Sequence, residues 1–130
     1  MESEGAAAGE GDMPLKVGVL ALQGDFAEHI ATFKRCNTAC EAVEIRKSEQ
    51  LEGLHGLVIP GGESTVMLKL LKEFGMLEDV RRFGTVGMPF FGTCAGCIMM
   101  SKSVDVDEAM AQSIQPNQET LELADFSVCR

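Results

Sequence analysis

The segment FFGTCAGCIMM, residues 90–100, places Cys94 in a turn of small residues between two hydrophobic stretches. The first stretch, MPFFG at 88–92, is typical of a buried strand, and residues 95–101 are typical of the start of a helix. A strand that leads through a sharp turn into a helix is the repeating unit of α/β proteins, whose neighbouring strands run parallel. The segment therefore predicts one β-α unit of a larger sheet.

The residues before it predict further units of the same kind. KVGVLAL (16–22) and GLVIP (56–60) are apolar runs of the sort found in strands covered on both faces, and CEAVEIRK (40–47) alternates like a strand. We expect Asp25 to cap the helix after the first strand. Apolar residues recur at helical spacing in three places: Phe26, Ile30 and Phe33; Val66, Met67, Leu70, Leu71 and Phe74; Met76, Leu77, Val80 and Phe83. The pattern predicts an α/β fold with a mainly parallel sheet between helices.

The two ends of the 130-residue chain differ from this middle part. Residues 1–14 lack periodicity and are predicted to be a disordered acidic leader, and residues 15–102 to be the folded domain. Residues 103–130 are predicted to be a divergent acidic tail, with a weak helical stripe (Val106, Met110, Ile114) but no further strong strand, so that the sheet is incomplete after about residue 102. Apolar tail residues are candidates to cover the edge that an incomplete sheet exposes: Val104, Val106, Met110, Ile114, Leu121 and Leu123.

Charge and cysteine content exclude several classes of protein. The net charge of −9 comes from the two ends, because residues 14–102 carry ten acidic and ten basic side chains. No basic patch suggests a nucleic acid or an anionic membrane as partner, and no apolar run approaches the roughly 20 residues that span a bilayer. Five cysteines without a secretion signal predict reduced thiols in a cytoplasmic protein, with Cys36, Cys40 and Cys129 unpaired.

Two turns carry the chemistry. In GTCAG (92–96) small residues flank a cysteine as in a nucleophile elbow, where the helix start is expected to lower the pKa of the Cys94 thiol and the N–H of Ala95 to face a developing oxyanion. PGGEST (60–65) offers glycine amides that suit the same negative charge, although a plain glycine turn with Ser64 as helix N-cap explains it too. Both turns follow strands, so parallel strands bring them to one edge of the sheet.

Other interpretations of Cys94 remain open. It is a small buried thiol, or it forms a redox pair with Cys97, since C-x-x-C at a helix start is typical of thiol-disulfide proteins. A zinc site that adds Cys36 and Cys40 is the weakest alternative, because the first pair falls at the far end of its helix.

VGVLALQGDFAEHI, EIRK, LVIPGGEST and PFFGTCAG, in this order, resemble the glutaminase subunits of pyridoxal 5'-phosphate synthase, which are class I glutamine amidotransferases. The resemblance covers about residues 15–101 and implies a flavodoxin-like three-layer sandwich. It also implies hydrolysis of L-glutamine to glutamate and ammonia, delivery of ammonia to a barrel-shaped synthase subunit, and no cofactor or metal. By position, Cys94 corresponds to the nucleophile, Gly62 and Ala95 to the oxyanion amides, and Gly62, Glu63 and Ser64 to the glutamine-contacting turn. Gln23 corresponds to a segment near the synthase interface and the oxyanion turn.

The sequence departs from this family in its histidines. The family takes its general base and the carboxylate that orients it from a His-x-Glu segment near the C-terminus, whereas this sequence has no histidine after residue 55. We expect His29 to be solvated or at an interface and His55 to lie at the amino end of the sheet. A C-terminally truncated or altered chain with negligible glutaminase activity is therefore expected, and the alternative is a non-catalytic form that still binds the synthase subunit.

Overall fold

A parallel sheet of four strands forms the centre of the protein. The computed structural model describes residues 14–36, 39–105 and 118–129, so most of the predicted leader and the stripe at 106–114 lie outside the described residues. The strands are β1 (Leu15–Leu20), β2 (Cys40–Ile45), β3 (Gly56–Ile59) and β4 (Phe90–Gly92). Their order is β2-β1-β3-β4 and every pairing is parallel. This order, typical of flavodoxin-like sheets, confirms the predicted α/β fold class.

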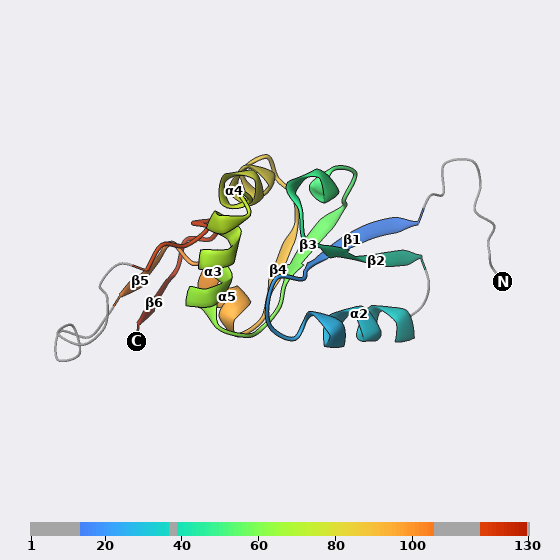
Figure 1. Ribbon diagram of the computed structural model, residues 1–130, viewed down its shortest axis with the longest axis horizontal. Coiled ribbons are helices and arrows are strands. Elements are labelled where there is room, and N and C mark those ends of the chain that lie inside the picture. The colour runs from blue at the N-terminus through green and yellow to red at the C-terminus, as the bar shows by residue number, and fades with distance from the viewer. Residues whose placement is uncertain (1–13, 37–38, 106–117, 130) are drawn as a thin grey trace.

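Helices follow β1, β3 and β4 as predicted, with ends that differ by a few residues, and a short helix that was not predicted follows β2. The helices are α2 (Phe26–Arg35), the 3₁₀ helix η1 (Ser48–Leu51), α3 (Ser64–Glu73), α4 (Leu77–Thr85) and α5 (Ala95–Met100). Figure 1 shows α2 on one side of β1 and β2, and η1 and α4 on the other. Helices on both faces cover a buried parallel sheet, as the apolar strands require.

The predicted cap at Asp25 is wrong in its mechanism. Asp25 is the N-cap residue of α2, but its side chain makes no capping hydrogen bond. Its backbone, at φ −88° and ψ 40°, is outside the extended region in which N-cap side chains usually reach back to the helix. The backbone N–H of Asp25 instead donates to the Gly61 carbonyl at 3.1 Å, which ties the start of α2 to the turn after β3.

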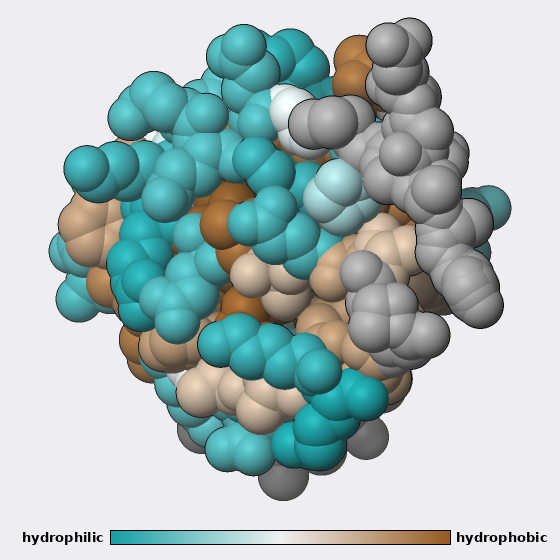
Figure 2. All heavy atoms as spheres, turned by 90° about the vertical axis from the view of Figure 1, so that its right-hand side faces the viewer, coloured by the Kyte–Doolittle hydropathy of each residue, from teal (hydrophilic) through white to brown (hydrophobic). Residues whose placement is uncertain are grey.

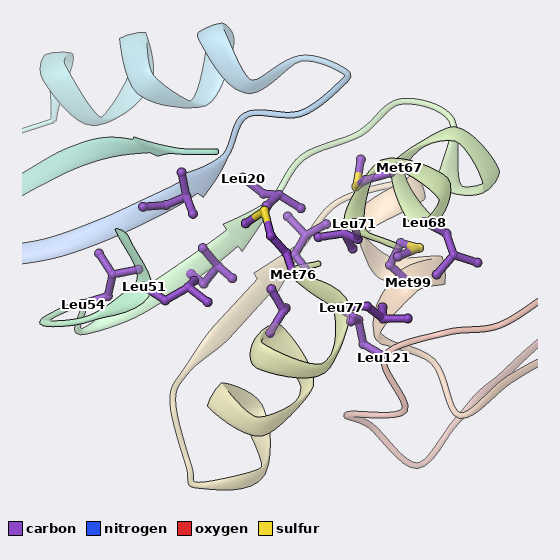
Figure 3. Close-up of a cluster of buried hydrophobic side chains, with 14 residues drawn as sticks. Leu20, Leu51, Leu54, Met67, Leu68, Leu71, Met76, Leu77, Met99 and Leu121 are labelled. Atoms are coloured by element: carbon purple, nitrogen blue, oxygen red, sulfur yellow. The ribbon is translucent and has the colours of Figure 1, made fainter. Parts of the chain in front are cut away.

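The hydrophobic core lies on the side of the sheet away from α2 (Figure 3). Strand residues pack there against one face each of α3, α4 and α5, and fully buried members include Leu20, Ile45, Leu57, Ile59, Met67, Leu71, Met76, Val80 and Met99. Burying one such side chain contributes about 1.5–3 kcal/mol. This one cluster therefore fixes how α3 and α5, the helices that begin after the two candidate turns, sit on the sheet.

Two short strands follow Lys102, where the sequence predicted no further strong strand. β5 (Ser103–Asp105) and β6 (Ser127–Cys129) pair in parallel as a separate two-stranded sheet, and each is too short to show a periodic signal. Val104 and Leu121 are 4% and 2% exposed. Both belong to the tail residues that were predicted as candidates to cover an exposed edge, and both are buried in the structure. The division of the chain into domain and tail at residue 102 stays a prediction.

An apolar edge remains at β4. Within the described residues β4 pairs with β3 alone, and its Phe91 is 59% exposed. Figure 2 shows the end of the molecule where β1 and β2 begin, on which hydrophilic residues surround a smaller group of hydrophobic ones. None of the described helices is both long and apolar enough to cross a membrane.

Candidate active site

Cys94 lies at a sharp turn between β4 and α5. Its φ of 50° and ψ of −112° are rare for any residue with a side chain, and Glu122 is the other non-glycine residue with positive φ in the described part of the chain. Such strain costs on the order of 1–3 kcal/mol and persists where the surroundings fix the backbone. The thiol is exposed, which excludes the buried structural interpretation. The predicted strand–turn–helix context of the elbow is confirmed.

Small residues around Cys94 are required because the end of β3 passes close to the elbow. A Cβ on Gly96 would lie 2.0 Å from the Ile59 carbonyl oxygen, and one on Gly92 would lie 2.6 Å from the Gly96 carbonyl oxygen. The N–H of Thr93 donates to the Ile59 oxygen at 3.2 Å. Backbone thus packs directly on backbone, so the glycines of the motif have a steric reason to be there.

The glycine turn after β3 lies against the elbow, as predicted. A Cβ on Gly61 would be 3.4 Å from the Cβ of Cys94, so the two turns touch. Gly62 has a φ of 149°, a conformation that favours glycine. The N–H groups of Gly62 and Ala95 have no hydrogen-bond acceptor among the described residues. Unpaired amides beside an exposed thiol are the groups that stabilise an oxyanion.

Ser64 is not the helix N-cap. Glu63 takes that position, while Ser64 is the first helical residue and is buried. The side-chain amide of Gln118 donates to the Ser64 hydroxyl oxygen at 3.0 Å. Gln118 lies in a segment without a clear helix or strand pattern, and no sequence pattern connects it with the glycine turn.

A third turn, between β1 and α2, braces the glycine turn. The side-chain carbonyl of Gln23 accepts a hydrogen bond from the Glu63 N–H at 3.0 Å. Gly24, at φ 92°, allows contact with the glycine turn, since a Cβ there would be 1.9 Å from the Gly61 oxygen. Gln23 therefore contacts the turn that was predicted to bind the substrate.

The two histidines lie at opposite ends of the sheet. His55 precedes β3, and its Nδ1 accepts a hydrogen bond from the Lys16 N–H at 2.9 Å, which confirms the expected amino-end position. His29 was expected to be solvated or at an interface. It is half-buried on α2, with Nε2 3.3 Å from the Thr93 hydroxyl oxygen, one residue before Cys94, and its place at an interface stays a prediction.

The remaining cysteines form no shared site. All five are free, including Cys94 and Cys97, and Cys36 lies at the far end of α2. Among the described residues no group of three or more histidine, cysteine or acidic side chains is placed to hold a metal ion.

A strap formed by residues 118–123 crosses the helices behind the site. Glu119 pairs with Lys72 of α3 and Arg81 of α4, the Thr120 hydroxyl donates to the Ser101 carbonyl at 2.6 Å, and the Leu121 N–H donates to the Met99 carbonyl at 2.7 Å. The hydrogen bond from Lys72 lowers the pKa of the Glu119 carboxyl. The strap therefore links α3, α4 and the end of α5.

Comparisons with known proteins agree with this arrangement. The model of the SNO glutamine amidotransferase family matches residues 19–130. The chain is 49% identical over 90 residues to the pyridoxal 5'-phosphate synthase subunit PdxT of Geobacillus kaustophilus, covering 69% of this chain and 45% of the relative. It is 44% identical over 120 residues to PdxT of Thermococcus gammatolerans, covering 89% and 57%. The chain thus spans about half the length of the curated relatives it matches.

Solved structures give the same result for the fold. A crystal structure of a glutamine amidotransferase superposes with a TM-score of 0.72 and 44% identity, over 88% of this chain and 56% of that one. A putative peptidase E protein from Listeria monocytogenes superposes with a TM-score of 0.63 at 14% identity, over 92% and 67%, and shows similarity of fold alone.

Proposed function

The chain belongs to the SNO glutamine amidotransferase family, and from this premise we propose that it carries the nucleophile of a glutaminase that acts on L-glutamine. The observation that supports this most directly is the contact between the two turns. The turn that carries Cys94, an exposed cysteine, touches a glycine turn whose amide at Gly62, like that of Ala95, has no acceptor among the described residues. An exposed thiol with available amides on its own turn and on the neighbouring turn is suited to attack on a carboxamide.

In the proposed reaction the Cys94 sulfur attacks the side-chain carbonyl carbon of glutamine. The carbonyl oxygen becomes an oxyanion that accepts hydrogen bonds from Gly62 and Ala95. The C–N bond then breaks, ammonia leaves with the proton from the thiol, and a thioester remains. Water hydrolyses the thioester to glutamate and restores the thiol.

The proton transfers of this reaction need a general base, and these 130 residues offer few candidates for it. The resemblance expects an imidazole beside the sulfur from a His-x-Glu segment, and the two histidines of this sequence are His29 and His55. His55 is at the wrong end of the sheet, and His29 bonds to Thr93. We therefore expect a polypeptide of these 130 residues to turn over glutamine more slowly than a family member that has the His-x-Glu segment. The expected difference is at least about 10²- to 10⁴-fold, the range typical of general acid–base catalysis.

The relatives named above are subunits of pyridoxal 5'-phosphate synthase, and we propose the same assembly for this chain. The partner is then the barrel-shaped synthase subunit that uses the ammonia, bound near Gln23 on the turn after β1. We propose that this role involves no nucleic acid, membrane or cofactor, and that the protein acts in the cytoplasm. Co-purification with the synthase subunit, reduced by substitutions in residues 23–25, tests the partner separately from the chemistry.

A glutamine analogue with a diazoketone in place of the carboxamide tests the nucleophile without a full catalytic cycle. It alkylates a thiol that is correctly placed relative to the glutamine pocket. We expect peptide mass spectrometry to find the adduct on Cys94, and Cys97→Ser to retain it as the matched control. Cys94→Ser is expected to remove it. Equal labelling of Cys94 and the exposed Cys36 would contradict the proposal.

A further inference from the structure

Three elements hold Thr93, the residue before the nucleophile. Its N–H donates to the Ile59 carbonyl at the end of β3, at 3.2 Å, and its carbonyl accepts a hydrogen bond from the Gly96 N–H in α5, at 2.8 Å. Its hydroxyl lies 3.3 Å from Nε2 of His29, which comes from α2, 64 residues away in sequence. Both peptide groups and the side chain of Thr93 are therefore fixed, each by a different element.

This fixation matters because the next residue is strained. Cys94 has a positive φ. A residue with a side chain relaxes out of this conformation unless its surroundings hold it there. The two backbone hydrogen bonds of Thr93 belong to the elbow and to its strand neighbour. The contact with His29 is the one that fixes the side chain of Thr93 from the opposite face of the sheet. Losing it frees the side chain to rotate and allows the peptide before Cys94 to shift.

We propose that His29 is a positioning residue for the elbow, which holds Cys94 through the Thr93 hydroxyl. The inference rests on the proposed function for its consequence in catalysis, though not for the clamp itself. Either partner can be the donor, depending on the tautomer of the imidazole. A side chain at position 29 that has both a donor and an acceptor is therefore expected to keep the hydrogen bond. The role requires a hydrogen bond at the position of Nε2, and it does not require His29 to gain or lose a proton.

Paired substitutions in the 130-residue chain test the clamp. His29→Leu removes the hydrogen bond, and His29→Gln keeps an amide near the position of Nε2. On the other side of the contact, Thr93→Val removes the hydroxyl at nearly constant shape, and Thr93→Ser keeps it. His55→Asn is the control, because it changes the other histidine, at the amino end of the sheet.

The first readout is the rate at which the diazoketone analogue alkylates Cys94. We expect about a three- to tenfold decrease for His29→Leu and for Thr93→Val, the effect of one lost hydrogen bond, and no further loss in the double variant. His29→Gln, Thr93→Ser and His55→Asn are expected to stay within about twofold of the parent rate. Alkylation of Cys36 by iodoacetamide serves as a reference for general thiol reactivity.

The second readout is amide hydrogen exchange in peptides that contain residues 92–97, which does not depend on glutamine chemistry. His29→Leu and Thr93→Val are expected to exchange faster there, and His29→Gln to match the parent. If the parent protein shows no labelling by the analogue but the exchange pattern holds, the proposed function fails and the clamp stands. Three outcomes would overturn the clamp. The first is that His29→Leu shows the exchange and labelling rates of the parent, and the second is that His29→Leu and His29→Gln slow labelling equally. The third is that the decreases in labelling rate of the two single variants add in the double variant.

Discussion

Gln23 accepts a hydrogen bond from the backbone N–H of Glu63, so the turn after β1 directly holds the turn after β3. The acceptor also fills the space beside Gly62, where a Cβ would lie 2.5 Å from Gln23 Oε1. The conformation of the glycine turn, and with it the direction of the Gly62 amide, therefore depends on a side chain that is 40 residues away in sequence. This dependence leads to the first prediction.

Gln23→Met keeps the length of the side chain and removes the acceptor. The Glu63 N–H then loses its partner, and we expect alkylation of Cys94 by the diazoketone analogue to slow by about tenfold, equivalent to about 1.4 kcal/mol. Gln23→Glu retains an oxygen acceptor and is the matched control, expected within about threefold of the parent. Equal rates for the methionine and glutamate variants would show that the hydrogen bond does not orient the turn.

Gly96→Ala tests the close approach of β3 to the elbow. Alanine usually stabilises a helix relative to glycine by about 1 kcal/mol, but here its Cβ would lie 2.0 Å from the Ile59 carbonyl oxygen. Backbone must move, so we expect the free energy of unfolding to fall by about 3 kcal/mol, measured by urea denaturation. Gly56→Ala, whose Cβ would have its nearest neighbour at an ordinary 3.4 Å, is the control. A Gly96→Ala protein as stable as the parent would refute this steric account.

The sequence predicts most of the fold because its signals are local. The apolar runs that became β1, β3 and β4, the helical spacing of α3 and α4, and the small residues around Cys94 are all read within a few neighbouring positions. The meeting of the two turns follows from one further rule, that parallel strands end at the same edge. For these reasons the fold class and the contact between the glycine turn and the elbow were predictable.

The contacts that brace the site were not predictable from sequence. Gln23 with Glu63, His29 with Thr93 and Gln118 with Ser64 join residues 40, 64 and 54 positions apart. Each depends on side-chain rotamers and on how helices lie on the sheet, which no local pattern encodes. The strands β5 and β6 were missed for a different reason, since three residues are too few to establish alternation.

Leu121→Ala tests whether the strap is part of the core. Leu121 is 2% exposed and belongs to the main cluster of buried side chains (Figure 3). Truncation leaves a cavity, and we expect a loss of about 2–5 kcal/mol in the free energy of unfolding. Phe126→Ala, in the same part of the chain but 38% exposed, is expected to cost less, about 1–2 kcal/mol. If Leu121→Ala unfolds at the parent urea concentration, the Leu121 side chain contributes no stability to the core.

Glu119→Gln tests the ion pairs of the strap through their pH dependence. The pKa of the Glu119 carboxyl is lowered, first by the hydrogen bond from Lys72 and then by that from Arg81, so the carboxyl binds its proton more weakly in the folded chain than in the unfolded one. The ion pairs therefore stabilise the fold above the unfolded pKa of about 4.3, and this stabilisation is lost as the pH falls through the lower folded value. Because Glu119 is partly exposed, solvent screening limits the effect to about 0.5–1 kcal/mol.

We expect urea denaturation to give a lower free energy of unfolding for Glu119→Gln than for the parent at neutral pH, and the two to converge below about pH 4. Glu122→Gln is the control, because its carboxylate lies 3.9 Å from Arg81 and is more exposed than that of Glu119. It should change stability less at neutral pH. A difference between Glu119→Gln and the parent that stays the same from neutral to acidic pH would mean that packing, and not charge, connects the strap to α3 and α4.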